Sequence, residues 1–456
     1  MPVPISAAKG IQWPAIPSAS NATLLALQYQ LEQSQWWPPE VLESHQLKQL
    51  SLLLAHTYKY VPFYRQRLEE FATQNFVLKD LGDLCSIPVI TRSEVQNNFE
   101  QMVATAMPED HLPASSSRTS GSTGKPINFV STRITKIFAR AFVLRSHLWQ
   151  ERDLTVKAAK ILVQAKPQGE KDQPYAVEDK EQQWISAFPS GTIASFDSGR
   201  PIDEQLDWLQ KRNPEWLVTY PSNLAALASA ARENDIALPA LRYLSTLGEM
   251  LTPHIRELCR EVWGIGIADV YSCRELNTIA LQCPHHDHYH VQSERLIVEV
   301  LDAGGRPCQP GEIGRVVLTD LHNYAMPFLR YELGDYAQLG EPCECGRTLP
   351  VLSRILGRTR NMLMLPSGER FWPSVILSNW AALGPISQLQ VIQQSPRDIE
   401  VKVVLTGPIS AAIEASLREK IRRDLRADFV VRLNYVDHIP RAKNGKFEDF
   451  ICTVDS

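Results

Sequence analysis

Long apolar segments are missing from this sequence. Nowhere do about 18 uncharged apolar residues follow one another, which is the length that a membrane-spanning helix needs. The N-terminal segment MPVPISAAKGIQWPAIP contains a single lysine and lacks the apolar run of a signal peptide. We therefore expect a cytoplasmic protein with no membrane partner.

Cysteine and net charge are also scarce. Eight cysteines in 456 residues are too few for a disulfide scaffold. The formal net charge is -4, so no strongly basic field is available for a nucleic-acid backbone, and we expect no nucleic-acid partner. With 44% hydrophobic and 21% charged residues, the chain has the composition of an ordinary globular protein of two or three domains.

Hydrophobic periodicity predicts how the N-terminal part is organised. Residues 46–70 have apolar positions at helical spacing, which predicts a helical layer. From about residue 155, short β-rich runs alternate with helical segments such as SNLAALASAAREN and PHIRELCREVW, an order typical of parallel α/β layers. The β-rich runs are KILVQ near 160, WLVTY ending at Tyr220, LRYLSTL near 244 and IADVY ending at Tyr271.

The C-terminal third has a different pattern. The runs RLIVEVLD and GEIGRVVLTDL predict a smaller antiparallel subdomain. Beyond about Gly357, QLQVIQQ, DIEVKVVL and FVVRLNYVD predict three strands, and one helix face carries Ile413, Leu417, Ile421 and Leu425. We expect an α/β fold with a large domain over residues 1–357, built of layered α/β subdomains and a β-rich subdomain, and a small α+β domain over residues 358–456.

The stretch TSGSTGKP at 119–126 has the composition of a phosphate-binding loop. Gly121 and Gly124 allow close approach of the backbone to an anion, the hydroxyl groups donate hydrogen bonds, and Lys125 adds a positive charge. A flexible Ser/Gly surface loop has the same composition. Pro126 stands where phosphate-transferring P-loop ATPases have a Mg-binding Ser or Thr, so a kinase or motor is disfavoured.

Further motifs follow along the chain: Leu247-Gly-Glu-Met250, Tyr271-Ser-Cys-Arg-Glu275, Arg330-Tyr-Glu-Leu-Gly-Asp335, Gly357-Arg358 and Asn444-Gly-Lys446. Together with TSGSTGKP they resemble, in order, the motifs of the adenylate-forming superfamily of acyl-CoA synthetases, adenylation domains and luciferases. The flanking runs PFLRYELGD and CECGRTLPVLSRILGR look most like its phenylacetate-CoA ligase branch. The resemblance extends from about residue 45 nearly to the C-terminus.

The resemblance implies a nucleotide site in which ATP and Mg²⁺ bind. Glu275 would help to hold Mg²⁺, Asp335 would accept hydrogen bonds from the ribose hydroxyls, and Arg358 would reach the ribose or phosphate side. Lys446 would enter the site from the small domain to contact the reacting oxygens, and leave it when that domain rotates. The phosphate loop would comprise Thr119, Ser120, Gly121, Ser122, Thr123, Gly124 and Lys125, and the pocket border Gly248, Glu249, Tyr271 and Ser272.

Two segments depart from the pattern of the superfamily. The run YSCRE places the thiol of Cys273 and the guanidinium of Arg274 beside the predicted acyl site. These groups could reshape the acyl pocket or answer an extra charge on the substrate. Arg360 stands where the hinge usually has an acidic residue or lysine, which puts the second half-reaction, and CoA as its acceptor, in doubt.

A separate group of cysteines and histidines predicts a structural zinc site. Cys343 and Cys345 form a short knuckle, and Cys283 precedes a histidine-rich turn that offers His285, His286, His288 or His290 as a fourth ligand. The resemblance to the phenylacetate-CoA ligase branch implies His290. The alternative is an exposed cysteine pair beside a solvated turn.

We expect an enzyme that uses ATP to convert a carboxylic acid, aromatic or otherwise apolar by resemblance, into an acyl-AMP and then passes the acyl group to a thiol, CoA by resemblance. An amine or a carrier protein is the alternative acceptor. A non-catalytic nucleotide-binding relative is a third interpretation. The sequence leaves the oligomeric state open, with a homodimer as one option.

Overall fold

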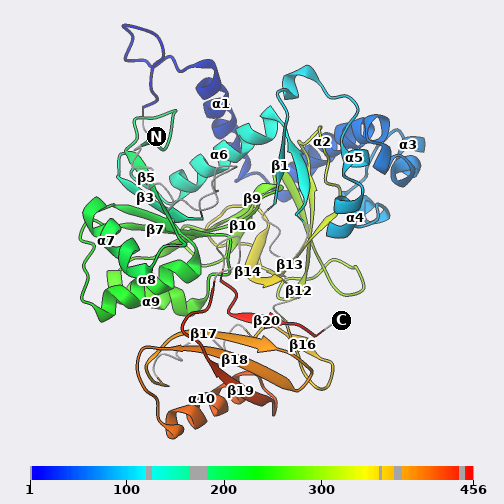
Figure 1. The fold of residues 1–456 in the computed structure, drawn as a ribbon. Helices are drawn as coiled ribbons and strands as arrows, with labels where there is room; N and C mark the ends of the chain where they lie inside the picture. The colour runs from blue at the N-terminus through cyan, green and yellow to red at the C-terminus, as the bar shows by residue number, and fades with distance from the viewer. Residues whose placement is uncertain are drawn as a thin grey trace.

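A mixed sheet organises most of the chain in the computed structural model, which describes residues 3–119, 126–163, 182–358, 362–373, 383–440 and 447–454. Twelve strands in the described residues pair in the order β11-β12-β13-β14-β10-β9-β8-β7-β6-β3-β5-β4. Figure 1 shows this sheet in the large part of the molecule, with a second, separate domain at its C-terminal side. The α/β class with a separate C-terminal domain is therefore confirmed, while the boundary between 357 and 358 stays a prediction.

One half of the large sheet is parallel and covered by helices. The parallel strands are β3 (Ala158–Leu162), β5 (Thr192–Asp197), β6 (Trp216–Thr219), β7 (Tyr243–Leu247) and β8 (Ile267–Cys273), with the short antiparallel β4 (Gln182–Gln183) at the edge. The helices α7 (Ile202–Arg212), α8 (Pro221–Glu233) and α9 (Pro253–Trp263) pack on this half. The predicted β-rich runs and both predicted helices lie here.

Local sequence signals place α9 between β7 and β8. Thr252 caps its first turn through a hydrogen bond from the backbone N–H of Ile255, and Pro253 occupies the first helical position, where no donor is needed. Gly264 ends the helix in the left-handed region with φ of +71°, which a side chain would disfavour. The buried face of Ile255, Leu258 and Cys259 then packs on the sheet.

The other half of the large sheet is antiparallel. It contains β9 (Asn277–Gln282), β10 (Tyr289–Val291), β11 (Leu296–Leu301), β12 (Ile313–Asp320), β13 (Tyr331–Leu339) and β14 (Val351–Arg358). Because β9 pairs with β8, the predicted antiparallel subdomain is not a sheet of its own but continues the parallel half. A short hairpin stands apart, made of β1 (Ser115–Arg118) and β2 (Asn128–Ser131).

The N-terminal helices cover the antiparallel half and its junction with α6 (Arg133–Trp149). The predicted helical layer over 46–70 is confirmed in part, since α2 runs over Pro39–Tyr60 and stops before Pro62, which cannot continue the helix without losing a hydrogen bond. The remaining helices of this region are α1 (Ala19–Ser34), η1 (Pro62–Tyr64), η2 (Gln66–Leu68), α3 (Glu69–Thr73), η3 (Leu81–Ser86), α4 (Arg92–Asn97), α5 (Phe99–Met102) and η4 (Glu109–His111).

The small domain has its own sheet and core. Its strands pair in the order β19-β18-β17-β20, with α10 (Ala411–Asp424) packed through Leu417 and Ile421. The three predicted strands correspond to β17 (Ile386–Gln393), β18 (Asp398–Leu405) and β19 (Val430–Tyr435). The strand β20 (Phe450–Cys452), parallel to β17, and the short pair β15 (Leu363–Met364) and β16 (Arg370–Phe371) were not predicted.

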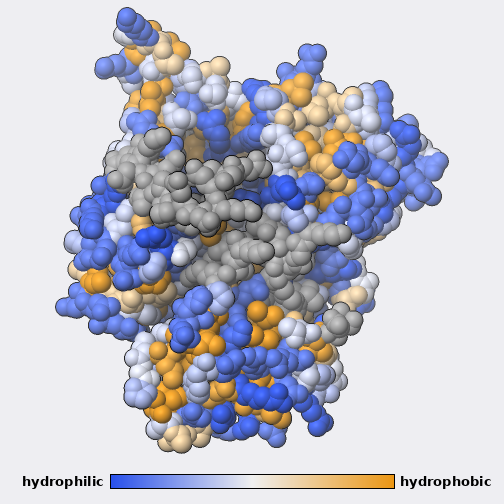
Figure 2. Space-filling model, in the orientation of Figure 1, coloured by the Kyte–Doolittle hydropathy of each residue, from blue (hydrophilic) through white to orange (hydrophobic). Residues whose placement is uncertain are grey.

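The outer surface agrees with the lack of long apolar runs. No helix among the described residues has the length and apolar character needed to cross a bilayer. Figure 2 shows hydrophilic and hydrophobic residues mixed over the visible face of both domains.

A buried ion pair joins the start of β11 to the end of β12. Arg295 is 1% exposed, Asp320 at the end of β12 is fully buried, and Arg295 Nη2 lies 2.7 Å from Asp320 Oδ2. A buried charge that loses its partner is strongly destabilising, because neither water nor another ion can solvate it.

We expect Asp320→Ala to lower the free energy of unfolding of the large domain by about 3–5 kcal/mol, because the Arg295 charge would stay buried without its carboxylate. Urea titration followed by tryptophan fluorescence measures this change. Glu261→Ala is the control, since its exposed carboxylate lies 3.6 Å from the exposed Arg232 and its loss should change stability by no more than about 0.5 kcal/mol. Equal losses in both variants would contradict this role of Asp320.

Candidate active site

Three residues from the predicted nucleotide site meet at Asp335. Asp335 on β13 and Arg358 on β14 are directly paired, and Arg358 Nε lies 3.3 Å from Asp335 Oδ1. The Tyr271 hydroxyl on β8 donates to Asp335 Oδ2 at 3.0 Å. Burial, and then the neighbouring Asp335 charge, raise the pKa of Tyr271 well above its usual value, so the phenol stays a donor. Asp335 is thereby held as an oriented, ionic hydrogen-bond acceptor.

The contact between Tyr271 and Asp335 requires a curved sheet. Strands β9, β10 and β14 separate β8 from β13 in the pairing order. Neighbouring strands lie about 4.8 Å apart, so four such steps in a flat sheet would span roughly 19 Å, far beyond the reach of one tyrosine. The curvature brings the two halves together on one side of the sheet.

The predicted phosphate loop closes a β-hairpin. At its base, the backbone N–H of Thr119 donates to the Ile127 carbonyl at 2.9 Å, and the Ile127 N–H donates to Thr119 Oγ1 at 2.9 Å. The pairing of β1 with β2 therefore brings the two ends of the loop together. The other predicted loop residues, Ser120, Gly121, Ser122, Thr123, Gly124 and Lys125, lie outside the described residues.

Glu275 lies beside this hairpin, at the position predicted for a Mg²⁺ ligand. It is 5% exposed, and its Oε1 lies 3.5 Å from Arg92 Nη1. The other terminal nitrogen of Arg92 donates to Thr119 Oγ1 at 3.1 Å. Arg92 therefore links the predicted metal ligand to the base of the phosphate loop.

Arg92 was missed by the sequence analysis. It is the first residue of α4, whose capping box joins Thr91 and Glu94, and the segment before it is tied to β13 through backbone hydrogen bonds of Ile90 with Arg330 and Glu332. The capping box signals a helix start and carries no sign of chemistry. Only tertiary packing brings this arginine to a site that lies 183 residues away in the sequence.

Glu249 connects the predicted nucleotide pocket to the small domain. It follows Gly248, whose φ of +80° turns the chain sharply at the end of β7. The two Glu249 carboxylate oxygens accept hydrogen bonds from the backbone N–H groups of Ser222, at 3.0 Å, and Phe447, at 2.8 Å. Phe447 directly follows Lys446, which itself lies outside the described residues, as does Arg360.

The unusual YSCRE segment lies at the end of β8. Arg274 Nη1 donates to the Arg118 carbonyl at 3.1 Å, which ties the segment to β1, and Ser272 is half-buried on β8. Burial, and then the charge of Glu275, raise the pKa of the Cys273 thiol well above its usual value. A thiol that stays protonated is a poor nucleophile, which disfavours covalent catalysis by Cys273.

All these groups line one large cavity of about 2410 Å³. Its wall includes Arg92 and Thr119, Gly248, Glu249, Tyr271, Ser272 and Glu275 at or just after the ends of β7 and β8, Asp335 and Arg358 on β13 and β14, and Phe447 from the small domain. The carboxyl ends of parallel strands are where open α/β sheets bind ligands. The structure thus brings together every predicted nucleotide-site residue that it describes.

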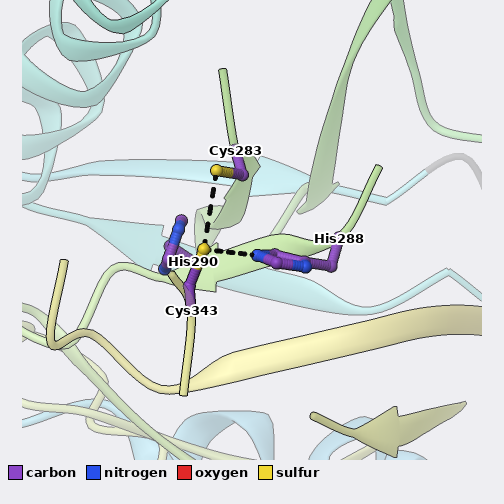
Figure 3. Close-up of side chains that lie close together, drawn as sticks. All are labelled: Cys283, His288, His290 and Cys343. Atoms are coloured by element: carbon purple, nitrogen blue, oxygen red, sulfur yellow. Dashed lines mark hydrogen bonds between the residues drawn. The ribbon is translucent and has the colours of Figure 1, made fainter. Parts of the chain in front are cut away.

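The predicted metal ligands form a second cluster, and none of them is among the residues that line this cavity. Cys283 follows β9, His290 lies on β10, and Cys343 lies between β13 and β14. With His288 they offer donor atoms that all lie within 4.8 Å of one another (Figure 3). The resemblance implied His290 among the four candidate histidines, yet His288 Nε2 also lies 3.0 Å from Cys343 Sγ.

Cys345 borders the same cluster. Its Sγ lies 3.4 Å from His290 Nε2, so a fifth donor lies next to a group that already offers the four ligands of tetrahedral zinc. Burial lowers the pKa of His290 to about 4, which keeps this imidazole neutral and able to bind a metal. Two or three sulfurs with one or two imidazoles are the donor set that zinc prefers, so the residues fit this ion.

Comparisons with known proteins agree with these motifs. The chain is 27% identical over 444 residues to a phenylacetate-coenzyme A ligase of Thermus thermophilus, covering 90% of this chain and 96% of that protein. It is 25% identical over 386 residues to the phenylacetate-coenzyme A ligase of Escherichia coli, covering 80% and 82% respectively. Residues 369–452 match the family of the CapK C-terminal domain.

Solved structures show the same fold. A 2-hydroxyisobutyryl-CoA ligase in the postadenylation state, in complex with an acyl-AMP, superposes with a TM-score of 0.72 at 19% identity, covering 99% of this chain and 97% of that one. The same ligase in its thioesterification state, with an acyl-AMP and CoA, gives 0.58 at 19% identity and covers 99% and 97%. Over most of its length the chain is therefore similar to phenylacetate-coenzyme A ligases, and it shares the fold of an acyl-CoA ligase, which agrees with the predicted adenylate-forming superfamily and its phenylacetate-CoA ligase-like branch.

Proposed function

We propose that this chain activates a carboxylic acid with ATP and transfers the acyl group to CoA. A carboxylate oxygen attacks the α-phosphorus of ATP, pyrophosphate leaves, and the CoA sulfur then attacks the acyl carbon while AMP leaves. The observation that carries the proposal is that the base of the phosphate loop, Glu275 and the Tyr271–Asp335–Arg358 group line the same cavity. The relatives named phenylacetate-coenzyme A ligase support the same reaction and an aromatic or otherwise apolar acid.

The residues of the cavity would catalyse by positioning and by neutralising charge. Asp335 would accept hydrogen bonds from the ribose hydroxyls, and Arg358 would lie on the ribose or phosphate side. Glu275 fits Mg²⁺, because a carboxylate next to phosphate oxygens is the environment this hard cation prefers. When bound, Mg²⁺ supplies positive charge against the phosphates. Arg92 would hold the Glu275 carboxylate and the loop base in one orientation.

The contact between Glu249 and Phe447 supports a small-domain position suited to the first half-reaction. Phe447 directly follows Lys446 in the sequence and lines the cavity, so Lys446 is attached to a segment that borders the predicted nucleotide pocket. A rotation of the small domain that breaks this contact would remove Lys446 before the acyl transfer, as hinge motions do in multi-step enzymes. Cytoplasmic location and homodimer formation stay predictions.

The acceptor is settled by offering CoA, amines and carrier proteins to the preformed acyl-AMP, because pyrophosphate exchange reports only the first step. Thioester formation with CoA is the expected result. Amide formation, or loading of a carrier protein with no CoA thioester, would replace CoA as the acceptor while leaving the adenylation step in place.

Asp335→Asn should raise the KM for ATP about 10- to 100-fold, because a neutral amide replaces a charged acceptor of the ribose hydrogen bonds. Acid-dependent exchange of pyrophosphate into ATP measures it. Asp302→Asn, which changes an exposed carboxylate paired with Arg306 outside the cavity, should leave the KM unchanged. An unchanged KM in both variants would remove Asp335 from the ribose site.

Lys446→Ala should lower the rate of acyl-AMP formation by about 10²–10³-fold, because one positive group would be missing where charge develops in the transition state. Binding of ATP, measured by isothermal titration calorimetry, should be retained. Lys402→Ala on β18, which does not line the cavity, is the control in the same domain. If Lys446→Ala keeps full exchange activity, the assigned role is wrong.

We also propose a structural zinc ion bound by Cys283, His290 and Cys343, with Cys345, as predicted, or His288 as the fourth ligand. Cys283 follows β9, His290 lies on β10, and Cys343 lies in the loop before β14. These three ligands therefore come from three neighbouring strands or the segments beside them. A closed, four-ligand site at this point would fasten the loop between β13 and β14 to the centre of the sheet. Such an ion would contribute to stability and not to the reaction.

The double variant Cys283→Ala/Cys343→Ala should abolish the zinc content of the purified protein and lower its melting temperature, because only three of the five nearby donors remain and three ligands cannot keep a closed site. Inductively coupled plasma mass spectrometry measures the metal. Cys85→Ala changes an exposed cysteine and should retain zinc. Comparing His288→Ala with Cys345→Ala identifies the fourth ligand as the one whose loss lowers zinc content, and an unmodified protein free of zinc would refute the site.

A further inference from the structure

Arg152 is a buried cation for which the described residues provide no carboxylate. Its residue is 6% exposed, and its Nε has no hydrogen-bond partner. Its terminal nitrogens contact His147 Nδ1 and Ser245 Oγ, the latter at 2.9 Å, and its guanidinium lies over the Trp216 ring at 4.3 Å. These partners are neutral, so the charge has hydrogen bonds and an aromatic face but no counter-ion.

The environment of Arg152 is costly without an anion. Burial lowers the pKa of Arg152 to about 10, which still leaves the guanidinium charged near neutral pH. Burial, and then the Arg152 charge, hold the pKa of His147 well below its usual value, so this imidazole stays neutral and accepts the hydrogen bond. A buried ion is stable only when it is paired and hydrogen-bonded. Arg152 is therefore prepared to bind an anion from outside the chain.

Arg152, His147 and Ser245 line the same cavity as the nucleotide-site residues. Ser245 on β7 lies three residues before Gly248, which is roughly 10 Å along a strand. This part of the wall is therefore separate from the residues that would bind the nucleotide. Ser245, Val218 and Lys160 are paired in one row across β7, β6 and β3, so their side chains share a face of the sheet. Lys160 adds a second, exposed cation to this row.

Helix α6 provides the opposite part of this wall. One helical stripe lines the cavity, formed by Lys136, Ala139, Arg140, Val143, Ser146 and His147. Ala139 and Val143 offer an apolar middle, while His147 lies next to Arg152 at the far end of the helix, roughly 16 Å from Lys136 along its axis. None of the cavity-lining residues described on α6, β3, β6 or β7 is acidic.

We propose that Arg152, together with Ser245 and Lys160, binds a second carboxylate on the acid substrate, and that the acid is a dicarboxylic acid with an apolar body. The proposal rests on the acid activation proposed above and names its substrate class. A planar guanidinium suits a carboxylate, and Ser245 adds a hydroxyl donor beside it. The body of the acid would lie against Ala139 and Val143, with its reacting carboxylate toward Tyr271 and Glu275.

Matched acid pairs test this proposal on the unmodified full-length protein. Pyrophosphate exchange is measured with para-carboxyphenylacetate against phenylacetate, terephthalate against benzoate, and adipate against hexanoate. In at least one pair the dicarboxylic acid should have a kcat/KM about 10- to 100-fold above its partner, as a charge-assisted hydrogen-bonded pair provides. Monocarboxylic acids used equally well or better in every pair would overturn the anion site while leaving acid activation in place.

Variants test whether Arg152 causes the preference for dicarboxylic acids. Arg152→Met should remove it by raising the KM for the dicarboxylic acid about 10- to 100-fold, with kcat and the KM for ATP within about twofold, and Arg152→Lys should restore part of it. Arg242→Met, an exposed arginine that pairs with Glu215 outside the cavity, should keep it. A preference that survives in a folded Arg152→Met would refute the assignment. If Arg152→Met does not fold by circular dichroism, Ser245→Ala provides the same comparison, with a smaller expected loss.

Absence of exchange with every acid of both series would refute acid activation itself, and the anion site would fall with it. This result differs from the refutation of the anion site alone, in which monocarboxylic acids are turned over.

Discussion

The hydrogen bond from Tyr271 to Asp335 joins the two halves of the large sheet, and the rest of the site depends on it. Tyr271 belongs to the last parallel strand and Asp335 to the antiparallel half, four strands further along the pairing order. The contact is possible only because the sheet curves, and the same curvature encloses the cavity. The burial that keeps Tyr271 protonated also keeps water from competing for Asp335, so fold and site are stabilised by one arrangement.

The arginines of this protein differ in how completely a carboxylate pairs with them. This difference distinguishes arginines that stabilise the fold from those at the predicted binding sites. Arg295 with Asp320 and Arg145 with Glu294 are complete pairs inside the domain, and they have no access to ligand. Among the buried arginines that the structure describes, Arg152 alone lacks a carboxylate partner, and it lines the cavity. Arg92 is intermediate, because its carboxylate partner Glu275 is itself a predicted metal ligand and lies at the longer distance of 3.5 Å. Incomplete pairing therefore coincides with the places where substrate and metal would bind.

The small domain contacts the large domain at Glu249 through a hydrogen bond from a backbone group. Glu249 is bound both by its own domain, through Ser222, and by the small domain, through Phe447. Two hydrogen bonds to backbone groups can be exchanged at low cost, so they suit a contact that forms and breaks in each catalytic cycle. The separate core of the small domain allows it to move as a unit.

The sequence by itself determined the order of most elements and, by resemblance, predicted which residues form the nucleotide site. Alternating strand and helix periods, caps such as Thr252 with Gly264, and motifs such as RYELGD are local, and local signals survive without a structure. Only the tertiary structure decided which distant residues meet. It merged the predicted antiparallel subdomain into one twelve-stranded sheet, brought His288 into the metal cluster, and placed Arg92 and Arg152 in the cavity wall. A helix-capping segment and an arginine after a helix look alike whether they face water or substrate, because burial and partnership are properties of the packed chain and not of its neighbouring residues.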